Sequence, residues 1–344
     1  MHPKLTDTLS KYQHIVLVGG WTGGHIQPIL NIATELHGTK LLWIGWEDSY
    51  EKQAAKDVKI DFESIPTLKL TSTKSPKVLL YPIVLMRWIL AARQVLKKAY
   101  ANIQWNGYIA VFSKWWPGSV AVGIAAWSLG IPLYIHESDT IPGRSNRILG
   151  HFATTVFLGF ESAKVYFNAK KCEVIGQILH RVFSNKKSQY QNIKHSISWK
   201  TDKKHLLIIC GSQWARVIFE EILKYMGAIL NGYEVILILG KLNTDMKKDF
   251  EASLKTIIHP SLQLLDWIDQ ESLASLIRDT DIAITRGSAT TLAELTAFEK
   301  TPHLIIIPLP HAANNHQYYN ALEYEKMWHT LLEQKNISTL TNLL

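Results

Sequence analysis

Short apolar runs alternate with helix-period segments along most of this chain, and that alternation limits the possible folds more than any other feature. In the first half, strands are predicted at residues 15–18, 41–44, 109–112, 132–135 and 155–158. In the second half, they are predicted at residues 205–210, 234–239, 282–285 and 304–307. Strands that are separated by helices usually pair in parallel, so the sequence predicts an α/β fold with doubly wound parallel sheets.

A polar stretch interrupts this alternation near the middle of the chain. Residues 184–204 are rich in Lys, Ser, Asn and Gln and poor in large apolar residues. A chain of 344 residues is long enough for two domains. We therefore expect an N-terminal domain at residues 1–183, a linker at 184–204 and a C-terminal domain at 205–344.

The charge of the chain points to an anionic partner. Its formal net charge is +8 and its pI is about 9.2, which suits a nucleotide, a nucleic acid or an anionic membrane. Nucleic acid is disfavoured because the basic residues cluster with aliphatic side chains rather than with aromatic stacking platforms. Two cysteines, Cys172 and Cys210, form no disulfide framework. We expect no signal peptide and no membrane-spanning segment.

A glycine-rich loop follows the first predicted strand. Residues 19–24 read Gly-Gly-Trp-Thr-Gly-Gly, and His25 and a helix-period segment come next. The order of strand, glycine loop and helix N-terminus is typical of an anion site, because free backbone N–H groups face the ligand. The spacing differs from the dinucleotide-binding fingerprint, and a tight turn without a ligand is the alternative.

The segment from Ser64 to His136 contains no Asp or Glu. Its cationic residues are Lys69, Lys74, Lys77, Arg87, Arg93, Lys97, Lys98 and Lys114. Within it, residues 78–90 are strongly apolar but too short to cross a bilayer. A basic and apolar segment of this kind can lie in a membrane interface, so we expect residues 69–98 to contact an anionic membrane surface. A buried helix with solvated lysines is the alternative.

Polar loops follow several predicted strands at their carboxyl ends, where open α/β sheets bind ligands. These loops occupy residues 136–147, 210–216, 285–294 and 308–321. Their hydroxyl, amide and imidazole groups suit a phosphorylated, hydroxyl-rich ligand. Glu294 could accept hydrogen bonds from the vicinal hydroxyls of a ribose, or it could be an ordinary solvated helix carboxylate.

Five of these stretches together resemble the motifs of the MurG family, which adds N-acetylglucosamine to lipid I in peptidoglycan synthesis. The stretches are Gly19–Pro28, His136–Arg147, Gly211–Arg216, Arg286–Glu294 and Pro308–Ala321. The resemblance implies two Rossmann-like domains of the GT-B type, with parallel sheets facing across a cleft. It implies an inverting transfer from UDP-N-acetylglucosamine to undecaprenyl-linked lipid I, with no cofactor and no metal ion. It also places the protein peripherally on the cytoplasmic face of the membrane.

The same resemblance implies roles for particular residues. The candidates for the catalytic base are His25, Glu137 and His136, and Glu137 could instead orient a histidine. Ser212 would hold the donor diphosphate, the backbone of Ile268 would face the uracil, and Glu294 would bind the ribose. The full set of expected substrate-binding residues is Thr22, Gly23, Gly24, Asp139, Asn146, His180, Arg181, Ser212, Gln213, Ile268, Arg286, Ala289, Thr290, Thr291, Leu292, Ala293, Glu294, His316, Gln317 and Asn320.

The chain departs from the family at a few positions. Arg181 stands one position later than the corresponding family arginine, and the family has further helices beyond the point that corresponds to Leu344. Tryptophan occupies positions where the family motifs carry glycine, namely Trp21, Trp115, Trp116 and Trp214, with Trp328, Trp46 and Trp105 as further candidates. An indole would fill space that a phosphate needs, and it is penalised at positive φ. We hypothesise that these positions are glycine codons (UGA) translated as tryptophan.

Two alternative functions follow from these departures. The first is a GT-B transferase for another lipid acceptor, such as a diacylglycerol. The second is a non-catalytic protein that binds nucleotide sugars, which genuine tryptophans in the motifs would favour.

Overall fold

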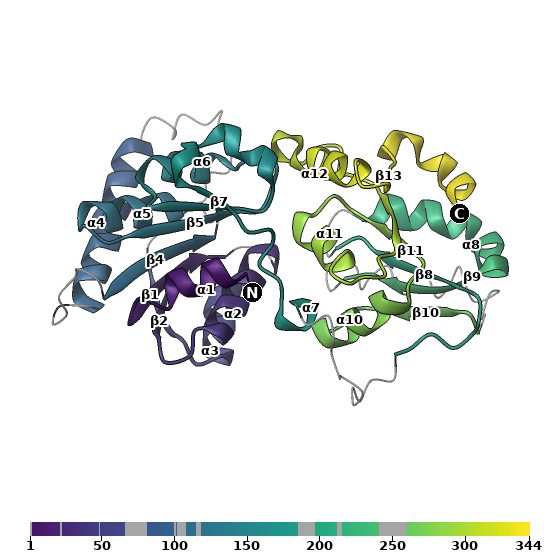
Figure 1. Ribbon diagram of the computed structural model, residues 1–344, viewed down its shortest axis with the longest axis horizontal. Coiled ribbons are helices and arrows are strands. Elements are labelled where there is room, and N and C mark those ends of the chain that lie inside the picture. Colours follow the sequence, from purple (N-terminus) through teal and green to yellow (C-terminus); the bar gives the residue numbers. More distant parts are fainter. Residues whose placement is uncertain are drawn as a thin grey trace. The chain divides into compact units, whose positions relative to one another are not determined.

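The computed structural model describes residues 2–20, 23–47, 49–65, 81–99, 101, 108–114, 118–184, 197–211, 215–240 and 260–344. The chain divides into two compact units, Met1–His180 and Arg181–Leu344. Each unit contains one parallel β-sheet with helices on its faces (Figure 1). The predicted linker falls largely on residues 185–196, outside the described residues, so its bounds stay a prediction.

The first unit is built on a seven-stranded sheet with the order β3-β2-β1-β4-β5-β6-β7, and every neighbouring pair is parallel. Its strands are β1 (His14–Gly19), β2 (Lys40–Gly45), β3 (Asp61–Ser64), β4 (Ile109–Lys114), β5 (Leu133–Glu137), β6 (Thr155–Leu158) and β7 (Cys172–Val174). Its α-helices are α1 (Pro3–Leu9), α2 (Gly23–Glu35), α3 (Tyr50–Asp57), α4 (Tyr81–Ala99), α5 (Ser119–Ser128) and α6 (Arg144–Phe152).

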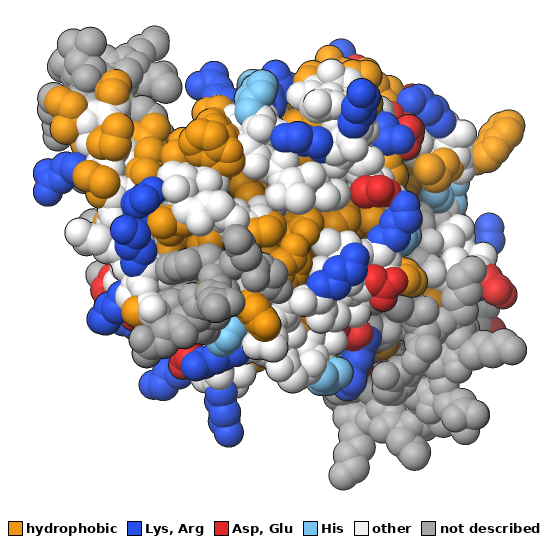
Figure 2. All heavy atoms as spheres, turned by 60° about the vertical axis from the view of Figure 1, so that its left-hand side comes forward, with side chains coloured by type: hydrophobic (Ala, Val, Ile, Leu, Met, Phe, Trp, Pro, Cys, Tyr) orange, Lys and Arg blue, Asp and Glu red, His pale blue; other side chains and the backbone are white. Residues whose placement is uncertain are grey.

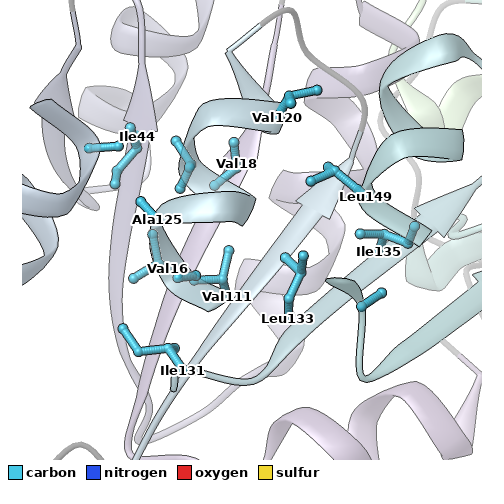
Figure 3. Close-up of a cluster of buried hydrophobic side chains, with 14 of the residues drawn as sticks. Val16, Val18, Ile44, Val111, Val120, Ala125, Ile131, Leu133, Ile135 and Leu149 are labelled. Atoms are coloured by element: carbon cyan, nitrogen blue, oxygen red, sulfur yellow. The ribbon is translucent and has the colours of Figure 1, made fainter. Parts of the chain in front are cut away.

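Alternate residues of these strands supply the cores on the two faces of the sheet. On one face, Val16, Val111 and Leu133 pack with residues of α4, α5 and α6 (Figure 3). On the other face, Leu17 and Phe112 pack with residues of α1, α2 and α3. The buried strands therefore read as continuous apolar runs, as parallel sheets that are covered on both faces should.

The second unit repeats this plan with a six-stranded sheet in the order β10-β9-β8-β11-β12-β13, again with parallel neighbours. Its strands are β8 (Lys204–Ile209), β9 (Tyr233–Ile238), β10 (Leu262–Leu265), β11 (Ile282–Thr285), β12 (His303–Ile306) and β13 (Thr330–Leu331). Its α-helices are α7 (Arg181–Ser184), α8 (Arg216–Gly232), α10 (Gln270–Asp279), α11 (Ala289–Leu295) and α12 (His316–Glu325), and a 3-10 helix spans Gln334–Leu343.

The strand order places a topological switch point in each sheet, between β1 and β4 in the first unit and between β8 and β11 in the second. Open α/β sheets bind ligands outside the carboxyl ends of their strands at such points. The glycine loop after β1 and the loop after β11 both begin there. The predicted α/β fold with doubly wound parallel sheets is confirmed. Among the described residues, no helix has the length and apolar character needed to span a membrane.

Candidate active site

A group of buried polar side chains lies at the carboxyl ends of β4 and β5. Lys114 ends β4, and it pairs in register with Gly19 of β1 and with His136 of β5. The Lys114 Nζ atom lies 2.7 Å from His136 Nδ1 and also donates to Ser138 Oγ. The sequence groups Lys114 with the other cations of the acid-free segment, but the structure buries its side chain in the first unit.

Both ring nitrogens of His136 are engaged. An ammonium group has only donors, so Nδ1 must accept from Lys114, and Nε2 carries the proton that is donated to the Gly176 carbonyl at 3.0 Å. Burial, together with the nearby Lys114 charge, lowers the pKa of His136 well below its usual value. This geometry leaves no free ring nitrogen for a substrate proton and speaks against His136 as the catalytic base.

Glu137 is held by the loop that follows it. Its Oε1 accepts from the Asp139 backbone N–H at 2.9 Å. Its Oε2 accepts from the Gly143 N–H at 3.2 Å and from the Asn146 side-chain amide at 2.9 Å. Burial, reinforced by the Asp139 charge, raises the pKa of Glu137 to about 7. These contacts favour Glu137 as the residue that shapes the loop. Asn146 contributes its side-chain amide to this arrangement, and its expected substrate contact stays a prediction.

The glycine loop is described at its two ends. Gly23 and Gly24 open α2 and His25 lies in its first turn, half-buried, whereas Trp21 and Thr22 lie outside the described residues. A carboxylate that the sequence did not single out lies beside this loop. Glu51, in the first turn of α3, is buried, and a Cβ atom on Gly20 would come within 2.6 Å of its Oε1. The lack of a Cβ atom on Gly20 leaves room for the Glu51 carboxylate in this position.

In the second unit, a buried arginine ties together the loops at the carboxyl edge of the sheet. Arg286, directly after β11, donates to the Ile307 and Pro308 carbonyls at 3.2 and 3.3 Å and to Gln334 Oε1 at 2.8 Å. Its pKa is lowered by burial. The Nη1 atom of Arg286 thus makes its contacts within the protein, and the expected substrate contact of this residue stays a prediction.

Gly287, the residue after Arg286, connects this edge of the sheet to α12. The Asn320 side-chain amide donates to the Gly287 carbonyl at 3.0 Å, and Asn320 is buried. Gln317, in the first turn of α12, accepts from the Leu309 N–H at 3.0 Å. His316 Nδ1 lies 2.7 Å from the Ala313 carbonyl. The structure therefore brings together the two motifs 286–294 and 308–321, as the sequence predicts for one site.

Glu294 is the titratable group of this edge whose environment is most unusual. It lies in α11 with 7% of its surface exposed, and burial alone raises its pKa to about 8. The alternative of a solvated helix carboxylate is therefore wrong. Of its neighbours in α11, Ala289 and Leu292 are buried, and the other expected contacts there, Thr290, Thr291 and Ala293, are half-buried.

The remaining expected residues fall in different places. Ser212 and Gln213 lie outside the described residues, as do Trp105, Trp115, Trp116 and Trp214. Ile268 is buried just before α10. His180 ends the first unit, half-buried, and Arg181 begins the second, exposed. Trp328 is 90% exposed with φ 71°, a backbone conformation that favours glycine.

Helix α4 presents an apolar stripe to solvent. Ile83, Met86 and Leu90 are exposed, and their spacing places them on one face of the helix. Trp88, Ala92 and Leu96 are buried on the opposite face. When the side of the molecule that carries α4 is turned forward, hydrophobic side chains gather there with lysine and arginine side chains nearby (Figure 2).

Comparisons with known protein families agree with the division of the chain into two units. Residues 15–158 match the glycosyltransferase family 28 N-terminal domain, and residues 205–343 match the glycosyltransferase family 28 C-terminal domain. Among solved structures, the crystal structure of Acinetobacter baumannii MurG superposes with a TM-score of 0.69 at 21% identity, covering 96% of this chain and 90% of that one. The UDP-GlcNAc 2-epimerase of Methanocaldococcus jannaschii superposes with a TM-score of 0.59 at 12% identity, covering 96% and 91%. Both likenesses show the GT-B type of fold.

Sequence relatives narrow the family further. The UDP-N-acetylglucosamine–N-acetylmuramyl-(pentapeptide) pyrophosphoryl-undecaprenol N-acetylglucosamine transferase of Clostridium perfringens is 30% identical over 327 residues, which cover 94% of this chain and 86% of that one. The protein of the same name from Synechococcus elongatus is 30% identical over 335 residues, covering 96% and 85%. The chain therefore belongs to glycosyltransferase family 28 and, within it, to the MurG family of N-acetylglucosamine transferases.

Proposed function

We propose that this protein transfers N-acetylglucosamine from UDP-N-acetylglucosamine to undecaprenyl-linked lipid I, forming lipid II. The observation that carries the proposal is the match, over almost the whole chain, to relatives that are named for this transfer. The switch-point loops support it, because both units offer polar groups and glycines at the sheet edge where such folds bind ligands.

In this proposal, the hydroxyl oxygen of the acceptor sugar attacks the anomeric carbon of the donor. The bond between that carbon and the diphosphate oxygen breaks, and UDP leaves with the electron pair. A base takes the hydroxyl proton, and we assign this role to His25. The assignment is supported by elimination, since His136 has both nitrogens engaged and Glu137 accepts three N–H groups. Histidine is also the side chain best suited to proton transfer near neutral pH.

The donor nucleotide is assigned to the second unit. Glu294 would accept the ribose hydroxyls, residues 289–293 would surround the nucleotide, and Ile268 would face the uracil. Burial of Glu294 is costly in the free protein, and hydroxyl donors from a ligand would offset that cost. Gln317 and His316, which open α12 beside Gly287, would reach the sugar or its phosphate. Neither the transfer step nor the departure of UDP is assigned a metal ion.

The acceptor carries a polyprenyl chain, so the protein must work at a membrane surface. We assign this contact to the exposed stripe of Ile83, Met86 and Leu90, with Arg87 exposed beside it and Lys97 and Lys98 in the last turn of α4. Apolar side chains would enter the interface and the cations would meet anionic headgroups. We expect the protein to bind the cytoplasmic face of the membrane peripherally.

The experiment uses the purified chain with radiolabelled UDP-N-acetylglucosamine in three parallel reactions, containing lipid I, diacylglycerol or no acceptor. The proposal predicts label in the lipid fraction with lipid I only. Label in diacylglycerol would establish the other lipid acceptor, and no transfer combined with intact UDP binding would establish a non-catalytic homologue. His25→Ala should lower kcat by about 100-fold or more while UDP binding is unchanged, because general-base catalysis contributes roughly this factor.

A further inference from the structure

Lys114 is a charged residue whose side chain is buried in the first unit. It lies at the carboxyl end of β4, on the switch-point side of the sheet, with Gly19 of the glycine loop as its register partner in β1. Its side chain is 1% exposed. An ammonium group is rarely buried so deeply unless its donors are satisfied and its charge is balanced nearby.

Among the residues that the structure describes, the side chains that contact the Lys114 ammonium or act on its charge come from the end of β5 and the loop after it. His136 and Ser138 contact Nζ directly. Glu137 and Asp139 act on it through their charges and favour its protonated form, whereas burial lowers the pKa of Lys114 to about 8. Lys114 is too enclosed to touch a substrate, so any effect on catalysis must pass through these neighbours.

The Lys114 ammonium group affects the loop at residues 137–143 in two ways. First, Nζ donates to His136 Nδ1, and this fixes the tautomer whose Nε2–H is donated to Gly176. Second, its positive charge favours the ionised form of Glu137. The ionised carboxylate is the form that accepts from Asp139, Gly143 and Asn146 together.

We propose that Lys114 is a positioning residue for the transfer reaction, whose buried ammonium fixes the His136 tautomer and keeps the Glu137 carboxylate ionised so that the 137–143 loop holds its shape. This inference rests on the proposed transferase activity. It concerns a residue that the sequence grouped with solvated or membrane-facing cations. Misplacing a loop by about 1 Å can lower a rate by roughly 100-fold, so a buried positioning charge can matter without touching substrate.

The proposal makes a directional prediction for pH dependence. In this proposal, activity requires ionised Glu137 and protonated Lys114. The fall of kcat/KM at low pH therefore reports protonation of the pair, and the fall at high pH reports its deprotonation. Removing the Lys114 charge takes away an interaction that favours the Glu137 carboxylate. The acid limb of kcat/KM should therefore move to higher pH, and kcat at neutral pH should fall by about 10- to 100-fold.

Two variants separate the charge from the hydrogen bond. Lys114→Met removes both, whereas Lys114→Gln removes the charge but keeps an N–H donor for His136. Lys170→Met is the matched control, because Lys170 is an exposed lysine of the same unit. We expect both Lys114 variants to move the acid limb upward, only Lys114→Met to shift the nitrogen-15 resonance of His136 Nδ1 by removing its donor, and Lys170→Met to do neither.

Nitrogen-15 NMR of the imidazole rings reads the tautomer of His136 without reference to activity. Wild-type protein should show neutral His136 with the proton on Nε2 at pH 6.5, which tests the geometry even if a variant fails to fold. A proton on Nδ1, or an imidazolium ring at that pH, would overturn the inference. Unchanged acid limbs in both Lys114 variants would also overturn it. If the wild type transfers no sugar at all, the proposed function fails, while the NMR result still decides whether Lys114 fixes His136.

Discussion

Gly287 lies directly against the backbone of Gln317, and a Cβ atom on Gly287 would come within 2.8 Å of the Gln317 carbonyl carbon. The contact joins the loop after β11 to the first turn of α12, and the bond from Asn320 to the Gly287 carbonyl reinforces it. Since both partners at the close approach are backbone atoms, neither can rotate away. The two motifs at the edge of the second sheet are therefore fixed relative to each other.

Gly287→Ala should push α12 away from the loop and cost about 1–3 kcal/mol in the free energy of unfolding, because overpacking against backbone cannot relax cheaply. UDP binding, measured by calorimetry, should weaken with it. Gly227→Ala is the control, since a Cβ there meets no atom within 4 Å and Gly227 lies inside α8. That change should instead stabilise the protein by up to about 1 kcal/mol. Equal effects of the two substitutions would contradict the close-contact argument.

Glu294→Gln should stabilise the protein at pH 8 and weaken UDP binding. Burial raises the folded-state pKa of Glu294 from 4.5 to about 8. A raised pKa means that the folded state holds a proton which the unfolded state has lost between these values. Stability should therefore fall by about 1.4 kcal/mol per pH unit from 4.5 toward 8, and the glutamine variant should lack this slope.

Thermal unfolding at a series of pH values measures the slope, and calorimetry in buffers of different ionisation enthalpy measures proton release. We expect UDP binding to release a proton from Glu294 below pH 8, because ribose hydroxyls bind the ionised carboxylate. A wild-type protein that binds UDP without proton release, with a slope shared by the variant, would remove Glu294 from the donor site.

Interior strands could be predicted from the sequence, whereas edge strands could not. The predicted runs became the interior strands of both sheets. The strands that prediction missed are β3, β7, β10 and β13, and each of them is the edge of its sheet. An edge strand is half-solvated and short, as in β13 with two residues. It therefore lacks the continuous apolar run that burial on both faces imposes on the strands between.

Prediction of the candidate active site from the sequence was limited in a similar way. His136 and Glu137 could be found because they follow a buried strand, but their roles depend on partners that spacing alone cannot reveal. Lys114 stands 22 residues before His136 and meets it only through the β4–β5 register. Glu51 resembles any helix carboxylate until Gly20 is seen to make room for it. In both cases, the three-dimensional pairing of strand ends supplies information that the linear pattern lacks.

Trp328→Gly should stabilise the protein by about 1 kcal/mol. Trp328 has φ 71°, and the bonds from its N–H to Glu325 O at 3.1 Å and from the His329 N–H to Tyr324 O at 3.4 Å form the helix-ending motif in which glycine is usual. Met327→Gly is the control, because Met327 is not among the residues at positive φ, and it should destabilise. Denaturant unfolding measures both. A loss of stability in Trp328→Gly would contradict the hypothesis that position 328 is encoded as glycine.

The codons test the same hypothesis directly. UGG codons at Trp21, Trp115, Trp116 and Trp214 would show that these positions are genuine tryptophans and not UGA glycine codons.

Replacing Met86 and Leu90 together by glutamine should weaken binding to anionic vesicles by about tenfold or more, because each apolar side chain contributes roughly 1–2 kcal/mol when buried in the interface. Val165→Gln is the control, since Val165 is also exposed but lies outside α4. Vesicle co-sedimentation measures the effect. Raising the salt concentration should weaken the wild type as well, through Lys97 and Lys98. Equal losses in the control and the α4 variant would show that the stripe is not the membrane contact.

The most direct test of the proposed transfer is the structure of the lipid product. Lipid I in anionic vesicles is incubated with the purified chain and UDP-N-acetylglucosamine, and the recovered lipid is analysed by mass spectrometry and proton NMR. We predict a mass increase of one N-acetylhexosamine residue and a β-linkage, as an inverting displacement on the α-linked donor requires. Release of UDP without a change in the lipid, or an α-linkage in the product, would contradict it.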